Sequence, residues 1–126
     1  MLKYIFITIS IFFINGSYAC DCVYNTNSLI ENYNSTEVIF RGKAESVKQI
    51  KLNNETYDEV TFVMNKIFKG VKNKKVIVYQ ESYSNCTIKF NVGEEWVVWA
   101  GTWNGLLSTN MCTKTVNVKN IEKGEL

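Results

Sequence analysis

The residues of this chain with the most evident chemistry are its four cysteines, Cys20, Cys22, Cys86 and Cys112. Cys20 and Cys22 are separated by one residue, Asp21. This spacing is compatible with a redox pair or with two anchors for separate disulfides. No helix follows this pair directly, and the two other cysteines offer partners, which disfavours a redox pair. Four cysteines allow three pairings, of which the one with a direct Cys20–Cys22 bond would close a small, strained ring. We therefore expect two disulfides rather than a redox enzyme.

Histidine is absent from the chain. Its absence removes Ser-His and Cys-His nucleophile pairs and any zinc site with histidine ligands. Glu94 and Glu95 are neighbouring carboxylates, but they lie at the edge of a predicted turn and are expected to be solvated rather than catalytic. The basic cluster of Lys72, Lys74 and Lys75 lies in a short connection and is typical of a solvated turn. We expect no enzyme, no cofactor, no metal of its own and no nucleic-acid partner.

Residues 1–19 have the layout of a secretory signal peptide. A basic start precedes an apolar run over residues 4–14, and the small residues Ser17 and Ala19 stand where signal peptidase reads the chain. The apolar run is about half as long as the roughly 20 residues that a membrane-spanning helix needs. We expect cleavage after Ala19, no membrane span and one secreted domain over residues 20–126.

The mature chain would carry one more basic than acidic residue, so its charge is nearly balanced. A lipid on Cys20, as in an outer-surface lipoprotein, is the weaker alternative to a free N-terminus. The leucine expected of a lipobox is missing, and lipidation would leave an odd number of cysteines for pairing. We expect a secreted, extracellular monomer.

Apolar residues alternate with polar ones over 37–45, which predicts a strand with Val38 and Phe40 on its inner face. Gly42 within this strand predicts a bend or bulge of the kind that closes a barrel. A second strand is expected over about 56–68, and the adjacent Ile67-Phe68 pair breaks its alternation, which again indicates a bulge. A short helix is expected within residues 25–33, with Leu29, Ile30 and Tyr33 on one side.

The remaining strands are expected over 75–79, 95–100 and 106–109, with Asn104-Gly105 forming the last hairpin turn. Thr26 or Asn27 is the expected cap of the helix, and residues 119–126 are expected to fray. The order of strands and helices does not suggest a parallel sheet. The predicted fold is therefore mainly β: a small five-stranded OB-type barrel with one or two short helices and two disulfides.

Three tryptophans lie in or beside the 95–100 strand. Trp96 and Trp99 occupy strand positions that favour a place in the core. Trp103 stands next to the Asn104-Gly105 turn and is the one expected to be exposed, where it could stack on a sugar.

Five segments, in chain order, carry a resemblance to a known family. They are Cys20-Asp21-Cys22, 37–44, 60–70, Cys86 followed by 90–101, and 107–112. Together they resemble the N-terminal domain of the tissue inhibitors of metalloproteinases, a netrin-like OB barrel. The third disulfide of that domain and the inhibitors' second domain have no counterpart here. The resemblance implies the pairs Cys20–Cys86 and Cys22–Cys112.

The resemblance also implies a mechanism, in which the α-amine and carbonyl of Cys20 chelate the catalytic zinc of a metalloprotease. The amine must be unblocked and must lose its proton, which its ordinary pKa of about 7.7–8.0 makes easy. Asp21 would enter the S1′ pocket, Cys22 would be the second anchor, and Ser84 and Asn85 would form a further contact segment. The inhibitors usually carry Thr or Ser at the Asp21 position. A netrin-like module that binds a protein or glycan without inhibition is the alternative.

Overall fold

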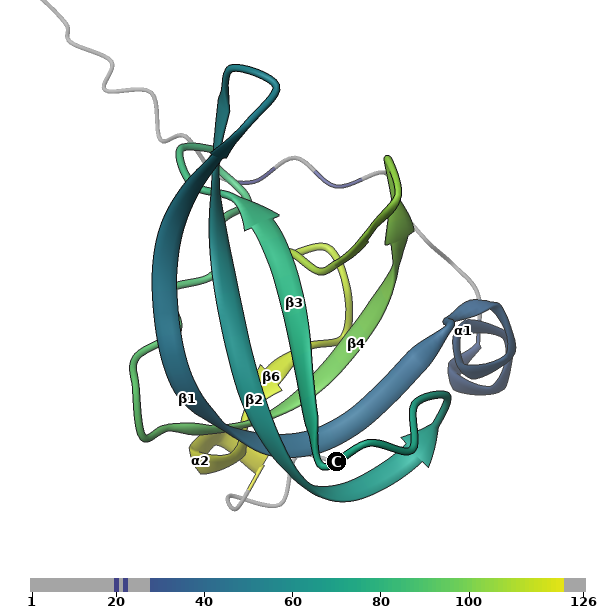
Figure 1. The fold of residues 1–126 in the computed structure, drawn as a ribbon. Coiled ribbons are helices and arrows are strands. Elements are labelled where there is room, and N and C mark those ends of the chain that lie inside the picture. The colour runs from purple at the N-terminus through teal and green to yellow at the C-terminus, as the bar shows by residue number, and fades with distance from the viewer. Residues whose placement is uncertain (1–19, 21, 23–27, 122–126) are drawn as a thin grey trace, which may run out of the picture.

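The computed structural model describes residues 20, 22 and 28–121, so the predicted signal peptide lies outside the described residues. Strands and two short helices follow one another in the described part of the chain (Figure 1). They are α1 (Leu29–Ser35), β1 (Val38–Leu52), β2 (Glu55–Lys69), β3 (Lys75–Glu81), β4 (Glu95–Trp103), β5 (Leu106–Ser108), β6 (Val116–Asn117) and α2 (Val118–Ile121).

Five of these strands close a ring in the order β1-β2-β3-β5-β4, with β4 pairing back to β1. The remaining strand, β6, attaches to β4 outside the ring. Neighbours are antiparallel except β3 and β5, which are parallel. The predicted five-stranded barrel with two short helices and two disulfides is confirmed.

Three register irregularities bend the long β1–β2 ribbon, which Figure 1 shows curving around the barrel. One shift leaves Phe68 of β2 without a partner in β1, a second lies between Arg41 and Gly42, and the third lies between Ala44 and Ser46. Gly42 is needed here because a Cβ at this position would lie 2.7 Å from the Val63 carbonyl oxygen. The bulges predicted at Gly42 and at Ile67-Phe68 are therefore confirmed.

The first strand is longer than predicted. It continues past residue 45 to Leu52 and turns back into β2 through Asn53 and Asn54, whose φ angles are 51° and 67°. Both angles lie in the left-handed region, which asparagine tolerates and which a tight hairpin turn requires. No residue in the outer half of β1, over 45–52, is buried. This half is held mainly by pairing with β2, and Val47 packs against the edge of the core.

The core contains a chain of aromatic rings. Phe62 packs edge-on against Phe40 and Phe90, each with ring centroids 5.3 Å apart, and Phe90 packs against Trp96 at 4.7 Å. All four side chains are buried. Edge-to-face packing of this kind adds about 0.5–1.5 kcal/mol per pair beyond the burial of area. The predicted place of Trp96 in the core is confirmed.

The second tryptophan of β4 does not share this position. Trp96, Val98 and Ala100 are buried, and the side chains of a strand alternate between its two faces. Trp99 is therefore on the opposite face, where it is half-buried. The prediction of a core position is wrong for Trp99, because its odd spacing from Trp96 directs it out of the barrel.

Helix α1 begins with a different cap from the one predicted. The Ser28 hydroxyl accepts a hydrogen bond from the Glu31 amide, and the Glu31 carboxylate accepts one from the Ser28 amide. This reciprocal capping box satisfies two backbone donors, so Ser28 is the N-cap. The prediction of Thr26 or Asn27 is wrong for this reason, and both residues lie outside the described part of the chain.

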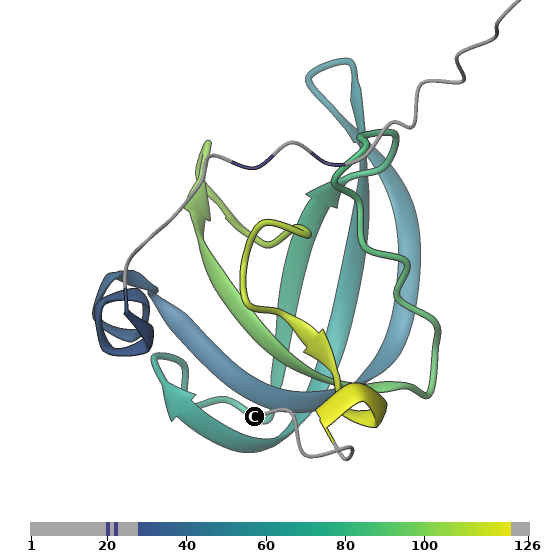
Figure 2. The same cartoon turned by 180° about the vertical axis from the view of Figure 1, so that it is seen from behind.

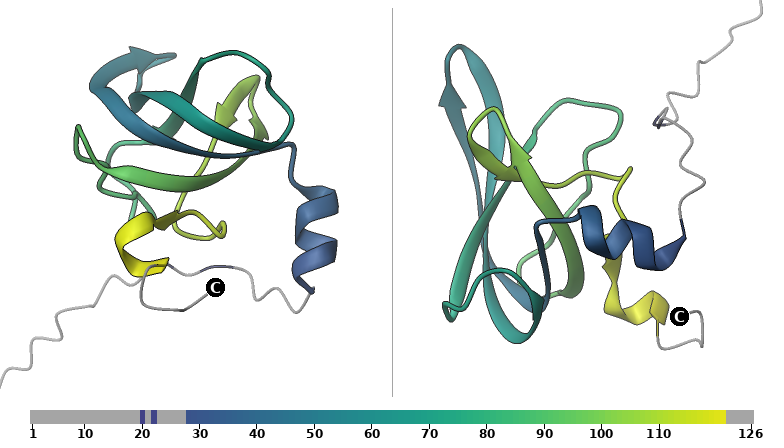
Figure 3. Two further views of the ribbon diagram at one scale, coloured as in Figure 1. Left: turned by 90° about the horizontal axis from the view of Figure 1, so that it is seen from below. Right: turned by 90° about the vertical axis from the view of Figure 1, so that its right-hand side faces the viewer.

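Both helices lie outside the ring of strands, as the views in Figure 3 show. No residue of α1 is buried, and the Tyr33 hydroxyl ties this helix to the Phe68 carbonyl of β2. Helix α2 occupies the start of the region predicted to fray, and the buried Val118 anchors it. Residues 122–126 lie outside the described part. Neither helix among the described residues is long and apolar enough to traverse a bilayer.

Candidate functional site

Two disulfides join the N-terminal cysteines to two loops of the barrel. Cys20 is bonded to Cys86, in the loop between β3 and β4, and Cys22 to Cys112, in the loop between β5 and β6. Their Cα atoms are 4.7 and 5.4 Å apart. These are the pairs that the family resemblance implies. Both loops lie on the near side of the barrel in Figure 2.

The two disulfides contact each other. The sulfur of Cys20 lies 3.3 Å from that of Cys112 and 3.6 Å from that of Cys22. The Met111 amide also donates a hydrogen bond of 2.9 Å to the Cys86 carbonyl, so the loops are joined by backbone as well. All four sulfurs are disulfide-bonded. In this state they offer no thiolate for redox chemistry or for metal binding.

The loop that carries Cys86 is held by Gln80 of β3. The Gln80 side chain accepts a hydrogen bond of 2.8 Å from the Ile88 amide and donates one of 2.7 Å to the Ile88 carbonyl. It therefore pairs with Ile88 as a neighbouring strand would. Gln80 is only 4% exposed, and it also donates to Asp58, which accepts a hydrogen bond from Ser82. This network therefore holds the loop on both sides of Cys86, at Ser82 and at Ile88.

Within this loop, Ser84 and Thr87 fold the backbone back on itself. The Cys86 amide donates to the Ser84 hydroxyl at 3.0 Å, and the Ser84 amide donates to the Thr87 hydroxyl at 3.1 Å. Ser84 is half-buried, whereas Asn85 is exposed. Ser84 therefore helps to set the backbone at Cys86, and Asn85 is the residue of this pair that is open to a partner.

Threonines hold the second loop. The buried Thr109 hydroxyl lies 3.0 Å from the Thr113 hydroxyl and 2.9 Å from that of Thr115, and it donates to the Trp99 carbonyl at 2.8 Å. Thr113 in turn donates to Thr115 at 2.7 Å. Sequence reasoning missed this cluster, because threonines near a turn give the same signal whether their hydroxyls meet each other or water.

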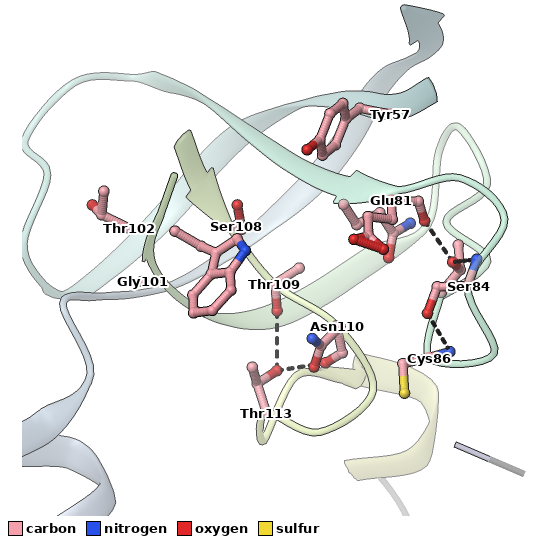
Figure 4. Close-up of a pocket in the computed structure, with 13 residues that line it drawn as sticks. Tyr57, Glu81, Ser84, Cys86, Gly101, Thr102, Ser108, Thr109, Asn110 and Thr113 are labelled. Atoms are coloured by element: carbon pink, nitrogen blue, oxygen red, sulfur yellow. Dashed lines mark hydrogen bonds between the residues drawn. The ribbon is translucent and has the colours of Figure 1, made fainter. Parts of the chain in front are cut away.

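An open groove of about 460 Å³ lies between the end of β3 and the strands β4 and β5, next to both disulfide loops. Figure 4 shows Tyr57 above Thr109, and Glu81 above Asn110. Three residues that were candidates from the sequence line the groove: Ser84, Cys86 and Trp103. Trp103 is 68% exposed, which confirms its predicted exposure. The lining comprises Tyr57, Gln80, Glu81, Ser84, Cys86, Thr87, Gly101, Thr102, Trp103, Ser108, Thr109, Asn110 and Thr113.

The carboxylate of Glu95 is partnered rather than solvated, which corrects the expectation for this residue. It accepts hydrogen bonds from the Arg41 guanidinium, at 2.9 Å, and from the Asn65 side chain. The bond from Arg41, followed by that from Asn65, lowers the pKa of Glu95 below its ordinary value. Lys75 likewise forms an ion pair with Glu45 at 2.9 Å, beyond the solvated turn expected of it.

Tyr57, which lines the groove, keeps its proton. Its hydroxyl donates a hydrogen bond to the Glu55 carboxylate at 3.1 Å. That bond is the main reason why the pKa of Tyr57 is raised, with smaller contributions from burial and from the charges of Glu55 and Glu81. The ring therefore presents a neutral surface to the groove.

The structure brings together four of the five residues expected to contact a protease. Cys20 and Cys22 lie on the joined disulfides, and Ser84 and Asn85 belong to the loop to which Cys20 is bonded. Asp21, the fifth, lies outside the described residues.

No protein-family model matches this chain, and a search of curated proteins finds no match either. The resemblance to the metalloproteinase inhibitors therefore rests on the five segments of the sequence and on the two disulfide pairs.

Proposed function

We propose that the mature protein begins at Cys20, is secreted, and inhibits zinc metalloproteases through the α-amine and carbonyl of that residue. The observation that carries the proposal is the contact between the two disulfides. Cys20 is bonded to one rigid loop, and its sulfur lies 3.3 Å from that of Cys112 in the other. A first residue held in this way loses little conformational freedom when its backbone binds a metal.

The hydrogen bonds that hold the two disulfide-bonded loops favour the same function. The Gln80 network holds one loop, and the threonine cluster around Thr109 holds the other. Cys20 is half-buried and Cys22 is exposed, so both residues are in contact with solvent while their disulfides hold them to these loops. The reference pKa of an α-amine is near 7.7–8.0, so such a group loses its proton at little cost when it binds zinc near neutral pH.

The remaining contact residues have different roles in this proposal. Asn85 is exposed beside the disulfides and is available to a protease surface, whereas the Ser84 hydroxyl accepts the Cys86 amide and acts by positioning. Asp21 would enter the S1′ pocket of the target. Burial of an unpaired carboxylate costs several kcal/mol, so the target is expected to have a cationic or water-filled pocket.

The test compares two forms of the mature protein against a panel of zinc endopeptidases. One form begins at Cys20, and the other carries one additional alanine before it. The form that begins at Cys20 is expected to inhibit, and the extended form is expected to lose inhibition because its cysteine nitrogen is in a peptide bond. Asp21→Thr, in the form that begins at Cys20, is expected to inhibit more strongly where the pocket is apolar.

Thermal unfolding and disulfide mapping of both forms provide the control, since an alanine before Cys20 should change neither. Equal inhibition by the two forms would refute chelation by the amine. If neither form inhibits any member of the panel, the non-inhibitory interaction module is the better account.

A further inference from the structure

The groove lies where the ring of strands has its shortest ladder, between β3 and β5. β3 and β5 pair only through Tyr79 and Ser108, and the Thr109 amide donates to the Tyr79 carbonyl at 3.1 Å. No second residue pair continues this ladder among the described residues. The open volume of about 460 Å³ beside it is within the range of small-molecule sites in proteins.

Gly101 of β4 lines this groove although its backbone does not require a glycine there. A Cβ built on it would have no atom within 4 Å, and its φ is not in the left-handed region. Glycine within a strand weakens the strand, and it often marks a place where a ligand or another backbone comes close. At Gly42, a Cβ would clash with the Val63 carbonyl, so the fold itself requires glycine there. The fold imposes no such requirement at Gly101.

Two aromatic residues belong to the same lining as Gly101. Trp103 is 68% exposed, and Tyr57 is half-buried on the β2 side. A tryptophan this exposed next to an open groove offers a flat apolar surface with a polar edge. The C–H face of a sugar ring is the complement of such a surface.

Two polar groups in the lining have unused hydrogen-bonding capacity. The Oδ1 of Asn110 accepts from the Cys112 amide, but its Nδ2 has no acceptor among residues 28–121. The Glu81 carboxylate likewise accepts no side-chain or backbone donor within the described residues. An amide donor and a carboxylate acceptor match the hydroxyl groups of a sugar, which both accept and donate.

The charge of the groove and the lack of a free edge on β5 limit the class of ligand that the groove can bind. Glu81 is the one charged residue in the lining given above, and no lysine or arginine is there to bind phosphate, sulfate or a nucleic-acid backbone. Strand addition by a peptide needs a free edge. The short strand β5 is paired on one side with β3 and on the other with β4.

We propose that this groove binds a neutral oligosaccharide. A sugar ring stacks on Trp103 and passes over Gly101, and Glu81 and Asn110 hydrogen-bond to its hydroxyls. This site goes beyond the inhibition proposed above and does not involve the amine of Cys20.

The test is a titration of the ¹⁵N-labelled mature protein, followed by NMR. The probes are cellohexaose, chitohexaose, xylohexaose and mannohexaose, with a heparin hexasaccharide as the anionic comparison. At least one neutral probe is expected to shift the Trp103 indole N–H and the backbone amides of Gly101 and Asn110 in a saturable way. The form extended by one alanine before Cys20 is expected to bind equally, so loss of inhibition does not affect this result.

Three variants place the ligand in the groove. Gly101→Val fills the space with a residue suited to a strand and is expected to abolish binding. Trp103→Ala is expected to weaken binding roughly tenfold or more, as loss of a stacked aromatic surface does. Tyr83→Ala is the matched control, because Tyr83 is an 81% exposed aromatic residue outside the lining, and its removal is expected to leave affinity unchanged.

Several results would overturn the proposal. It is wrong if none of the four neutral probes gives saturable shifts at millimolar concentration, or if the heparin hexasaccharide binds more tightly than all of them. It is also wrong if Trp103→Ala, or a folded Gly101→Val, binds like the wild type. The spectrum of each variant reports its fold, so if Gly101→Val fails to fold, Trp103→Ala decides the question.

Discussion

Replacement of Gln80 by leucine tests how the loop that carries Cys86 is held. Leucine has a similar size and suits a position that is only 4% exposed, but it cannot hydrogen-bond. In Gln80→Leu, the Ile88 amide and carbonyl both lose their partner, at 2.8 and 2.7 Å in the wild type. Each is a buried backbone group, and an unsatisfied one destabilises the fold by about 1–3 kcal/mol.

The expected loss of unfolding free energy is therefore roughly 2–5 kcal/mol, a large part of the roughly 5–15 kcal/mol typical of a domain. Urea denaturation with the disulfides intact measures it. Hydrogen exchange at the Ile88 amide reports the same bond locally, and its protection should fall sharply. Gln49→Leu is the matched control, because Gln49 is exposed on β1 and its loss should change stability by less than about 0.5 kcal/mol.

A loss of less than about 1 kcal/mol in Gln80→Leu relative to Gln49→Leu, with the Ile88 amide still protected from exchange, would contradict this role of Gln80. That result would mean that another group or a water satisfies the Ile88 backbone, and that the loop does not depend on Gln80.

Two further predictions concern the strands. Gly42→Ala is expected to lower stability by about 1–3 kcal/mol, because its Cβ would lie 2.7 Å from the Val63 carbonyl oxygen, whereas Gly101→Ala should be tolerated; urea midpoints compare the two. The pKa of Glu95 is lowered in the folded protein chiefly by Arg41, so the stability from this carboxylate is present above the ordinary glutamate pKa and is lost as pH falls through the folded-state pKa. Wild type and Glu95→Gln should therefore differ most near neutral pH and converge in acid, and a constant difference across pH would contradict this.

Much of the barrel could be predicted because its turns and bulges depend on residues with distinctive backbone freedom. Asn104 and Gly105 have φ angles of 53° and 80°, and Gly93 has 94°, which are conformations that these residue types signal locally. Gly42 indicated its bulge for a different reason, because a glycine within an alternating strand is typical of a place where another backbone comes close. Alternation of apolar residues then placed the inner faces of the central strands.

Other features could not be predicted because they depend on partners that are distant in the chain. The outer half of β1 looks like a polar loop, and only its ladder to β2 makes it a strand. Gln80 and Thr109 are the buried polar residues of the described chain, yet in the sequence they are indistinguishable from surface residues. Glu95 has the sequence context of a solvated carboxylate, and only strand pairing brings Arg41 to it.

The candidate site divides in the same way. The cysteines, and Trp103 as an exposed aromatic residue, could be identified from residue type and position. The groove could not, because its volume lies beside the one residue pair that joins β3 to β5, and no short segment of sequence encodes how far two strands separate around such a pair.

The single bridge between Tyr79 and Ser108 has a consequence for how the molecule fluctuates. Every other joint in the ring is a ladder of several residue pairs, so this one should open at the lowest free energy. The Thr109 amide should then exchange fastest among the amides that hold the ring closed. When the joint opens, the closed barrel becomes a curled sheet with two bare edges. A molecule lying across the groove would span this joint and keep the barrel shut.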